Sequence, residues 1–297
     1  MRLINVKENY AGIICRGLPW LLGIALSGTA FARDGAPAAA DARAAAGDTG
    51  WFSHWGSARA QFNVDEDIHL DDRSIDLLVP VYDSGQTLFI TQLSGRRRAS
   101  RDTYNIVAGV RTLVNNWMFG LNTFFDDDVT GGNRRSGVGG EIGTHYLKLS
   151  ANLYLRSGDW HPSRDFANNA ERPANGYDIR AEAYLPAYPQ LGVRLIFEQY
   201  MADNVALFGK ENRLDNLRAA TGGLTYTPIP LLTFGVDHRK GSARNSDSHI
   251  GIRFTYRLGE TWQYQIDPSA VDSARRLPVS RFDPVERNGN VLLDYQH

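Results

Sequence analysis

The sequence has very little cysteine, no long apolar run beyond its start, and almost no net charge. Cys15 is the one cysteine in 297 residues, and it lies in a segment that we expect to be removed. The mature chain then has no thiol for disulfides, metal binding or nucleophilic catalysis. No later segment reaches about eighteen consecutive apolar residues, and the mean hydropathy is −0.35, which excludes a bundle of membrane-spanning helices. The formal net charge of −1 gives no support for nucleic-acid binding.

The start of the chain has the pattern of a secretory signal peptide. Basic residues precede an apolar run at 18–31, which ends in the small-x-small site Ala30-Phe31-Ala32. A membrane-spanning helix needs roughly twenty apolar residues, more than this run provides, so a signal peptide is favoured over an anchor. We predict a signal peptide at 1–32 that is cleaved after Ala32, and a flexible periplasmic leader at 33–50.

Apolar and polar residues then alternate in segments that recur as far as Leu258. In residues 147–156, LKLSANLYLR, the alternation has no break. Successive side chains of a strand point to opposite faces, so each segment has one apolar and one polar face. Twelve strands are predicted, near residues 57–64, 74–82, 86–93, 104–113, 117–125, 137–146, 148–156, 177–185, 192–199, 217–226, 231–239 and 249–258.

The connections between these segments alternate between short and long. The short ones are 83–85, 114–116, the junction near Leu147, 186–191 and 227–230; the long ones are 94–103, 126–136, 157–176, 200–216 and 240–248. Placing all the long loops at one end is typical of a bacterial outer-membrane barrel, which has short periplasmic turns and long extracellular loops. A soluble lipocalin-like barrel would turn its apolar face inward and needs only about eight strands.

The residues on the two faces agree with a membrane barrel. Aromatic residues that would form interfacial girdles lie at predicted strand ends, at Trp117, Tyr146, Tyr188, Tyr226 and Trp262. Charges on an inward face are tolerable when they meet each other or water. The predicted lumen charges are Asp178, Arg180, Glu182, Arg194, Glu198, Arg253 and Arg257. We therefore predict an all-β fold, a transmembrane antiparallel β-barrel of about 12 strands at 51–259.

The chain continues beyond the last predicted strand. Asp267-Pro268-Ser269 predicts a helix start, with Asp267 or Ser269 capping residues 270–276. The residues that follow resemble the linker of inverse autotransporter barrels of the intimin and invasin family, S-R-[YF]-D-x-V-x-R-N-x-x-[IV]-x-L-x-Y. The matching positions are Ser280, Arg281, Phe282, Asp283, Val285, Arg287, Asn288, Val291, Leu293 and Tyr295.

This resemblance, which covers residues 51–296, implies a twelve-stranded barrel whose linker threads the lumen and carries a passenger to the cell surface. The sequence ends at His297, so we expect no passenger, and adhesion through passenger domains is not carried over. We expect residues 260–297 to form a helix and a lumen plug; a periplasmic tail ending in an unpaired strand is the alternative. The linker charges Arg275, Arg276, Arg281, Arg287, Asp272, Asp283 and Glu286 are expected to pair with Asp178, Glu182, Arg194 and Arg253.

Two charged clusters fall in predicted extracellular loops. Residues 126–128, all aspartate, are interpreted as a solvated acidic loop rather than a calcium site. The cluster of Arg96, Arg97, Arg98 and Arg101 has two interpretations, an ordinary solvated loop or a contact for lipopolysaccharide phosphates.

No catalytic constellation is apparent. Asp237 and His238 are adjacent, which places them on opposite faces of a strand, and His145, His161 and His249 have no nearby serine motif. We predict no enzyme activity, no cofactor and no metal.

The sequence therefore predicts an exported, multi-pass outer-membrane barrel with a structural or surface-attachment role. Its expected partners are outer-membrane lipid and lipopolysaccharide, the barrel-assembly machinery during insertion, and an unknown host or cell-surface ligand. Two alternatives stay open: a porin-like channel for small solutes, and a truncated translocator of a longer adhesin.

Overall fold

A computed structural model of the protein describes residues 56–65, 70–209, 211–242 and 245–296. The predicted signal peptide with its cleavage site at Ala32 and the predicted leader at 33–50 lie outside these residues.

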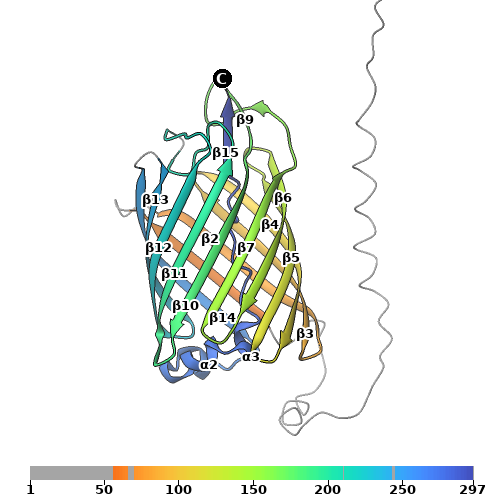
Figure 1. Ribbon diagram of the computed structural model, residues 1–297, viewed down its shortest axis with the longest axis vertical. Helices are drawn as coiled ribbons and strands as arrows, with labels where there is room; N and C mark the ends of the chain where they lie inside the picture. The colour runs from red at the N-terminus through yellow and green to blue at the C-terminus, as the bar shows by residue number, and fades with distance from the viewer. Residues whose placement is uncertain (1–55, 66–69, 210, 243–244, 297) are drawn as a thin grey trace, which may run out of the picture. The chain divides into compact units, whose positions relative to one another are not determined.

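Twelve antiparallel strands close into a barrel (Figure 1). β1 pairs with both β2 and β14, which closes the sheet, and β7 pairs directly with β10. The barrel strands are β1 (Gly56–Val64), β2 (Leu70–Asp83), β3 (Thr87–Arg98), β4 (Arg101–Val114), β5 (Trp117–Asp128), β6 (Asn133–Gly143), β7 (Leu147–Arg156), β10 (Asn175–Leu185), β11 (Tyr188–Met201), β12 (Arg218–Ile229), β13 (Leu232–Gly241) and β14 (Ser246–Leu258). The prediction of a twelve-stranded all-β barrel is confirmed.

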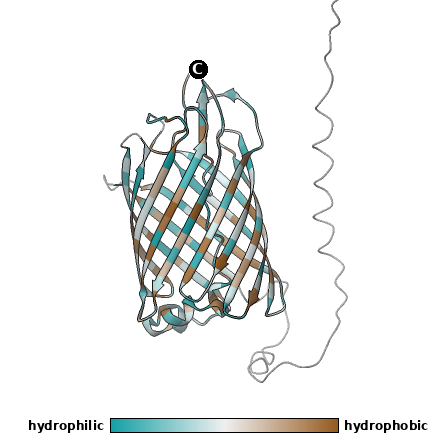
Figure 2. Cartoon of the chain, in the orientation of Figure 1, coloured by the Kyte–Doolittle hydropathy of each residue, from teal (hydrophilic) through white to brown (hydrophobic). Residues whose placement is uncertain are grey.

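The barrel wall carries its apolar side chains on the outside. Leu121 and Leu224 are 70% and 67% exposed, whereas the charged Asp76 and Asp126 are buried inside. Figure 2 shows the resulting alternation of apolar and polar positions along each strand. A closed barrel satisfies every backbone group between its strands and can therefore face lipid.

Several strands are longer than predicted at the long-loop end. β3 and β4 extend to a turn at Ala99 and Ser100, both with positive φ (48° and 64°), so the predicted loop 94–103 is wrong. β5 includes residues 126–128, so the predicted acidic loop is also wrong. These ends extend past the apolar band, where both strand faces are polar and the alternation that marks a strand is lost.

Three strands lie outside the barrel. β8 (His161–Pro162) and β9 (Ala170–Pro173) belong to the long segment between β7 and β10, and they form a small sheet with β15 (Leu293–Gln296) in the order β15-β9-β8. In Figure 1 this sheet lies at the long-loop end of the barrel.

Short helices follow β14 at the opposite, short-turn end (Figure 1). They are α1 (Trp262–Ile266), the 3-10 turn η3 (Pro268–Ala270), α2 (Val271–Arg275) and α3 (Leu277–Ser280). Asp267 caps η3 by accepting the Ser269 backbone N–H at 2.8 Å. The helix predicted at 270–276 corresponds to α2, which begins one residue later and ends at Arg275, since Arg276 is extended. None of the helices in the described ranges is long and apolar enough to span a membrane.

The outward apolar band predicts a depth-dependent cost for charge. Leu121→Arg, near mid-height in β5, is expected to lower the free energy of unfolding by about 2–4 kcal/mol, because the guanidinium would face the bilayer centre. Met201→Arg, at the long-loop end of β11, should cost only about 0–1 kcal/mol. Urea unfolding in lipid vesicles measures both variants, and equal losses would contradict the orientation of the wall.

Candidate functional site

The lumen is occupied by the linker, which we define as residues 281–292 between α3 and β15. Its backbone is bonded to the barrel wall at successive heights. The Ser57 hydroxyl donates to the Phe282 carbonyl oxygen at 2.6 Å, the Val285 N–H donates to Gln92 at 2.8 Å, and Asn105 donates to the Gly289 carbonyl at 2.9 Å. In Figure 1 the linker runs inside the barrel from the short-turn end to the long-loop end.

The lower linker combines an apolar anchor with ion pairs. Phe282 and Val285 pack in one buried cluster with inward side chains of β2 and β3. The Asp283 carboxylate pairs with the Lys148 ammonium and, at 3.1 Å, with the Arg257 guanidinium. Arg111 donates to the Asp283 carbonyl oxygen at 2.7 Å.

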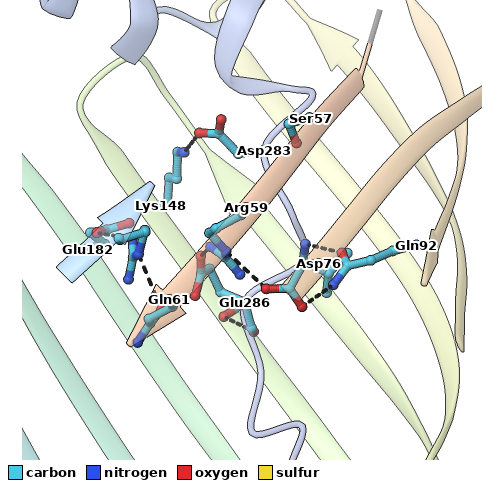
Figure 3. Close-up of polar contacts among 12 residues, drawn as sticks. Ser57, Arg59, Gln61, Asp76, Gln92, Lys148, Glu182, Asp283 and Glu286 are labelled. Atoms are coloured by element: carbon cyan, nitrogen blue, oxygen red, sulfur yellow. Dashed lines mark hydrogen bonds and ion pairs between the residues drawn. The ribbon is translucent and has the colours of Figure 1, made fainter. Parts of the chain in front are cut away.

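Glu286 continues a chain of opposite charges across β1 and β2 (Figure 3). Its carboxylate pairs with the Arg59 guanidinium, which also contacts Asp76 at 3.2 Å. Asp76 in turn pairs with Arg96 at 2.9 Å. Arg59 and Asp76 are 6% and 1% exposed, so each of these charges depends on its neighbours for solvation.

Arg287 is the most deeply buried charge of the linker. It donates to both carboxylate oxygens of Asp126, at 3.0 and 2.7 Å. Arg135 binds the same carboxylate at 2.8 Å, and all three side chains are at most 2% exposed. Arg287 also lies over the Phe124 ring, 4.2 Å from its centroid. A bidentate guanidinium–carboxylate pair fixes geometry as well as charge.

Asn288 connects the linker to β7 and β11. Its N–H donates to the Tyr154 hydroxyl at 2.7 Å, and its side-chain amide donates to the Tyr200 hydroxyl at 2.8 Å. Tyr154 donates in turn to Asp178 at 2.6 Å. The Asn288 carbonyl oxygen accepts a hydrogen bond from Arg135.

At the long-loop end, β15 is held by the loops around it. Asp294 pairs with Arg172 of β9 at 3.0 Å and accepts the Asn204 N–H at 3.1 Å. The Tyr295 hydroxyl donates to Asp165 at 2.9 Å. Burial and this hydrogen bond to a carboxylate raise the pKa of Tyr295.

All seven predicted lumen charges lie on the inward face, but their partners differ from those expected. Of the seven, Arg257 alone forms an ion pair with a linker side chain, Asp283. Asp178 and Glu198 contact Asn288 instead. The others pair within the wall: Arg180 with Asp178, Arg194 with Asp237, and Arg253 with Gln61 and, at 4.0 Å, Glu182.

The charges of the linker and of the helices before it also have partners other than those expected. Arg281 pairs with Asp83 at 2.8 Å, Arg276 with Asp272, and Arg275 with the Thr227 hydroxyl. The remaining motif positions Ser280, Val291 and Leu293 are buried.

The two predicted loop clusters belong partly to the lumen. Asp126 and Asp128 are buried, and Asp128 pairs with Arg101 at 2.5 Å. Arg96 points inward to Asp76, whereas Arg97 lies outside beside Asp102 at 3.5 Å. Asp126 and Asp128 keep the inward parity of Asn122 and Phe124, so continuing the alternation into the charged residues would have found them.

The predicted aromatic girdle residues lie at the short-turn end. Trp117, Tyr188, Tyr226 and Trp262 are 41% to 55% exposed. Tyr146 instead bonds Asp272 of α2 at 2.7 Å, which ties the C-terminal helices to the β6–β7 turn.

The linker does not fill the lumen evenly. A cavity of about 160 Å³ lies between it and the inward faces of β11–β14 and β1–β3, with Arg194, Glu198, Asp237 and Arg239 in its lining. A wider recess of about 540 Å³ at the long-loop end shares Arg98, His249 and Asn290 with this cavity. Open space therefore remains beside the linker and continues to the long-loop end.

A family model described as the inverse autotransporter β-domain matches residues 27–289. The chain belongs to the inverse autotransporter family. Among solved structures, one from a study of in-meso crystallization of membrane proteins superposes with a TM-score of 0.78, at 43% identity over 81% of this chain and 100% of that chain.

Relatives of the intimin and invasin type span the barrel and its linker. Invasin of Yersinia enterocolitica is 49% identical over 246 residues, 83% of this chain and 30% of its own length. Intimin of Escherichia coli O157:H7 is 42% identical over 266 residues, 90% of this chain and 28% of its own length. The inverse autotransporter adhesin YeeJ of Escherichia coli K12 is 42% identical over 258 residues, 86% of this chain and 11% of its own length. This inverse autotransporter barrel is an outer-membrane protein, and it corresponds to less than a third of each of these relatives.

The Asp126 cluster predicts an order of destabilisation. Asp126→Asn should cost about 3–5 kcal/mol, the range for breaking a buried pair, because it leaves both Arg135 and Arg287 without their carboxylate. Arg287→Gln should cost less, since Arg135 still neutralises Asp126. Urea unfolding in lipid vesicles measures both variants. The control Arg276→Gln removes an exposed pair with Asp272 and should change nothing measurable; a loss as large as that of Asp126→Asn would refute the ranking.

Proposed function

We propose that this barrel is the translocation unit of an intimin- or invasin-type surface protein, that its own linker closes the lumen as a plug, and that it has a structural or surface-attachment role. One observation carries the proposal. The linker contains four ionised side chains, Arg281, Asp283, Glu286 and Arg287, and each meets an opposite charge on the wall. A segment lying in the lumen by chance would leave some of these charges without partners.

The course of the linker supports outward passage of the chain. The helices at the short-turn end precede it, and β15 with β9 follows it at the end that carries the long loops. Short turns face the periplasm in bacterial barrels and long loops face outward. The chain would therefore leave the barrel at the cell surface.

The attachment role is inferred from the relatives, of which YeeJ is named an adhesin. A host or cell-surface ligand would bind either the long loops or a segment that follows β15.

We further expect the barrel-assembly machinery to insert the barrel into the outer membrane. The chain is exported before it folds, so its strands have to be assembled at the membrane.

A porin-like channel is the second candidate. The cavity beside β11–β14 and the recess that shares lining residues with it favour this reading, because together they form an open polar region along the linker. The narrow lumen near the short-turn end argues against a channel, since the space bounded by Arg253, Arg257 and Glu286 has a volume of only about 30 Å³.

Single-channel conductance in planar bilayers distinguishes the two candidates. We expect the folded full-length barrel to be electrically silent, and a variant lacking residues 269–297 to conduct steadily, because the linker and its ion pairs are then missing. Equal steady conductance in both proteins would make the channel the better description.

A full-length variant provides the matched test if the deletion does not fold. Asp283→Asn, Glu286→Gln and Arg287→Gln together remove three linker charges without shortening the chain. We expect intermittent openings in this variant and none in Arg276→Gln, whose pair with Asp272 lies outside the lumen. A triple variant as silent as the wild type would show that these ion pairs do not hold the plug.

A further inference from the structure

The outer wall carries a row of hydrogen-bonding side chains at the long-loop end of β10, β11 and β12. Tyr177 is opposite Gln199, and Gln199 is opposite Arg218. The Tyr177 hydroxyl donates to the Gln199 side-chain oxygen at 3.0 Å. This bond fixes the amide so that its NH₂ group remains available as a donor beside Arg218.

Lys240 adds a second cation next to this row. It lies on β13 opposite Ala220, which is two residues from Arg218 on β12. Arg218 and Lys240 are therefore diagonal neighbours, a separation of about 7–8 Å that long side chains can bridge. Both are exposed, and neither has an ion-pair partner among the residues that the structure describes.

Two outward cations on the opposite side of the barrel have carboxylate partners. Arg97 pairs with Asp102 at 3.5 Å, and Arg134 pairs with Asp127 at 3.3 Å. Outward carboxylates on neighbouring strands thus neutralise these cations. The outward strand positions around Arg218 and Lys240 are Gln199, Ala220, His238, Ser246 and Ser248, none of which is acidic. Asp215 lies in the loop segment that precedes Arg218.

The outward surface directly below the two cations is mostly apolar. Ala220 and Gly222 have small or absent side chains, and the space where a Cβ of Gly222 would stand is empty for 4 Å around. Leu195, opposite Gly222, and Leu224, two residues further down β12, are 57% and 67% exposed. A ligand here would meet positive charge at the rim and a lipid-facing apolar surface below it.

We propose that Arg218 and Lys240 bind the phosphate of a phosphorylated glycolipid in the outer leaflet, the chemistry that lipopolysaccharide offers, with an acyl chain lying over Ala220 and Gly222. The guanidinium fork and the ammonium supply charge-assisted hydrogen bonds to phosphate oxygens. The Gln199 amide is placed to donate to a sugar hydroxyl. This lipid-facing apolar surface is the reason for choosing a lipid-borne phosphate over a free anion. This rim site lies on the outer wall, so it is independent of the linker and of the proposed closure of the lumen.

Binding of lipid A to the full-length barrel in detergent tests the rim site. We expect the apparent Kd for diphosphorylated lipid A to rise by at least about tenfold in the double variant Arg218→Gln/Lys240→Gln, since two charge-assisted bonds are lost. Removing the phosphates from lipid A should have a similar effect on the wild type. The control Arg134→Gln removes an outward cation that Asp127 already neutralises, and its Kd should stay within about twofold of the wild type.

Other outcomes would overturn the proposal. Unchanged binding in the double variant would exclude these two residues, and an equal loss in Arg134→Gln would indicate attraction by overall charge. Inorganic phosphate that displaces lipid A at a concentration near the lipid Kd would identify a site for a free anion. Heat-modifiable gel mobility checks that each variant is folded, and Arg218→Lys, which keeps the charge, should retain most of the binding. Single-channel conductance should be the same in all these variants, which separates this test from that of the plug.

Discussion

The structure depends on the neutralisation of charges inside a closed wall. A carboxylate or guanidinium that faces the lumen cannot move to water without opening the barrel, so it needs an opposite charge within reach. Asp126 shows the constraint most clearly, because Arg135 of the neighbouring strand and Arg287 of the linker both bind it in a nearly dry environment. Glu286 and Arg59 stand in the same relation lower in the barrel. The wall and the linker are thus two parts of one charge arrangement, and neither is electrostatically complete alone.

The linker also takes the place of a hydrophobic core. Near the short-turn end, Phe282 and Val285 pack against inward apolar residues of β2 and β3, including Leu78 and Ile90. Higher in the lumen, contacts become polar and run through Asn288 to Tyr154 and Tyr200. An apolar anchor below and directional hydrogen bonds above fix the position of the linker along the barrel axis, because a shift of one residue would separate Arg287 from Asp126 and Glu286 from Arg59.

The inner face of the wall meets the lumen and the outer face meets lipid, so charged residues are accommodated differently on each face. Most inward charges are paired with an opposite charge, whereas outward charges are confined to the rim, where a cation costs little because it can reach the headgroup region. On β3–β6 the rim cations have protein carboxylates beside them; on β12 and β13, Arg218 and Lys240 do not. The membrane itself is then the available source of negative charge. The same strands thus bind the linker with their inward side chains and contact lipid with their outward side chains.

The sequence by itself determined that the chain forms an outer-membrane barrel, because alternation assigns each residue to one of two faces and the short and long connections assign the ends. It also determined the inward position of residues such as Asp178 and Arg257, and the linker motif between Ser280 and Tyr295. Only the tertiary structure decided how far the strands extend beyond the bilayer, since residues such as Arg96 and Asp126 stand where both faces are polar and the contrast between apolar and polar residues is lost. It alone decided the partners too. The alternation along a strand tells which face a charge lies on, but not which partner it meets. Asp126 pairs with Arg287, 161 residues away in the chain, because strand register and closure of the barrel place the two residues at the same height in the lumen.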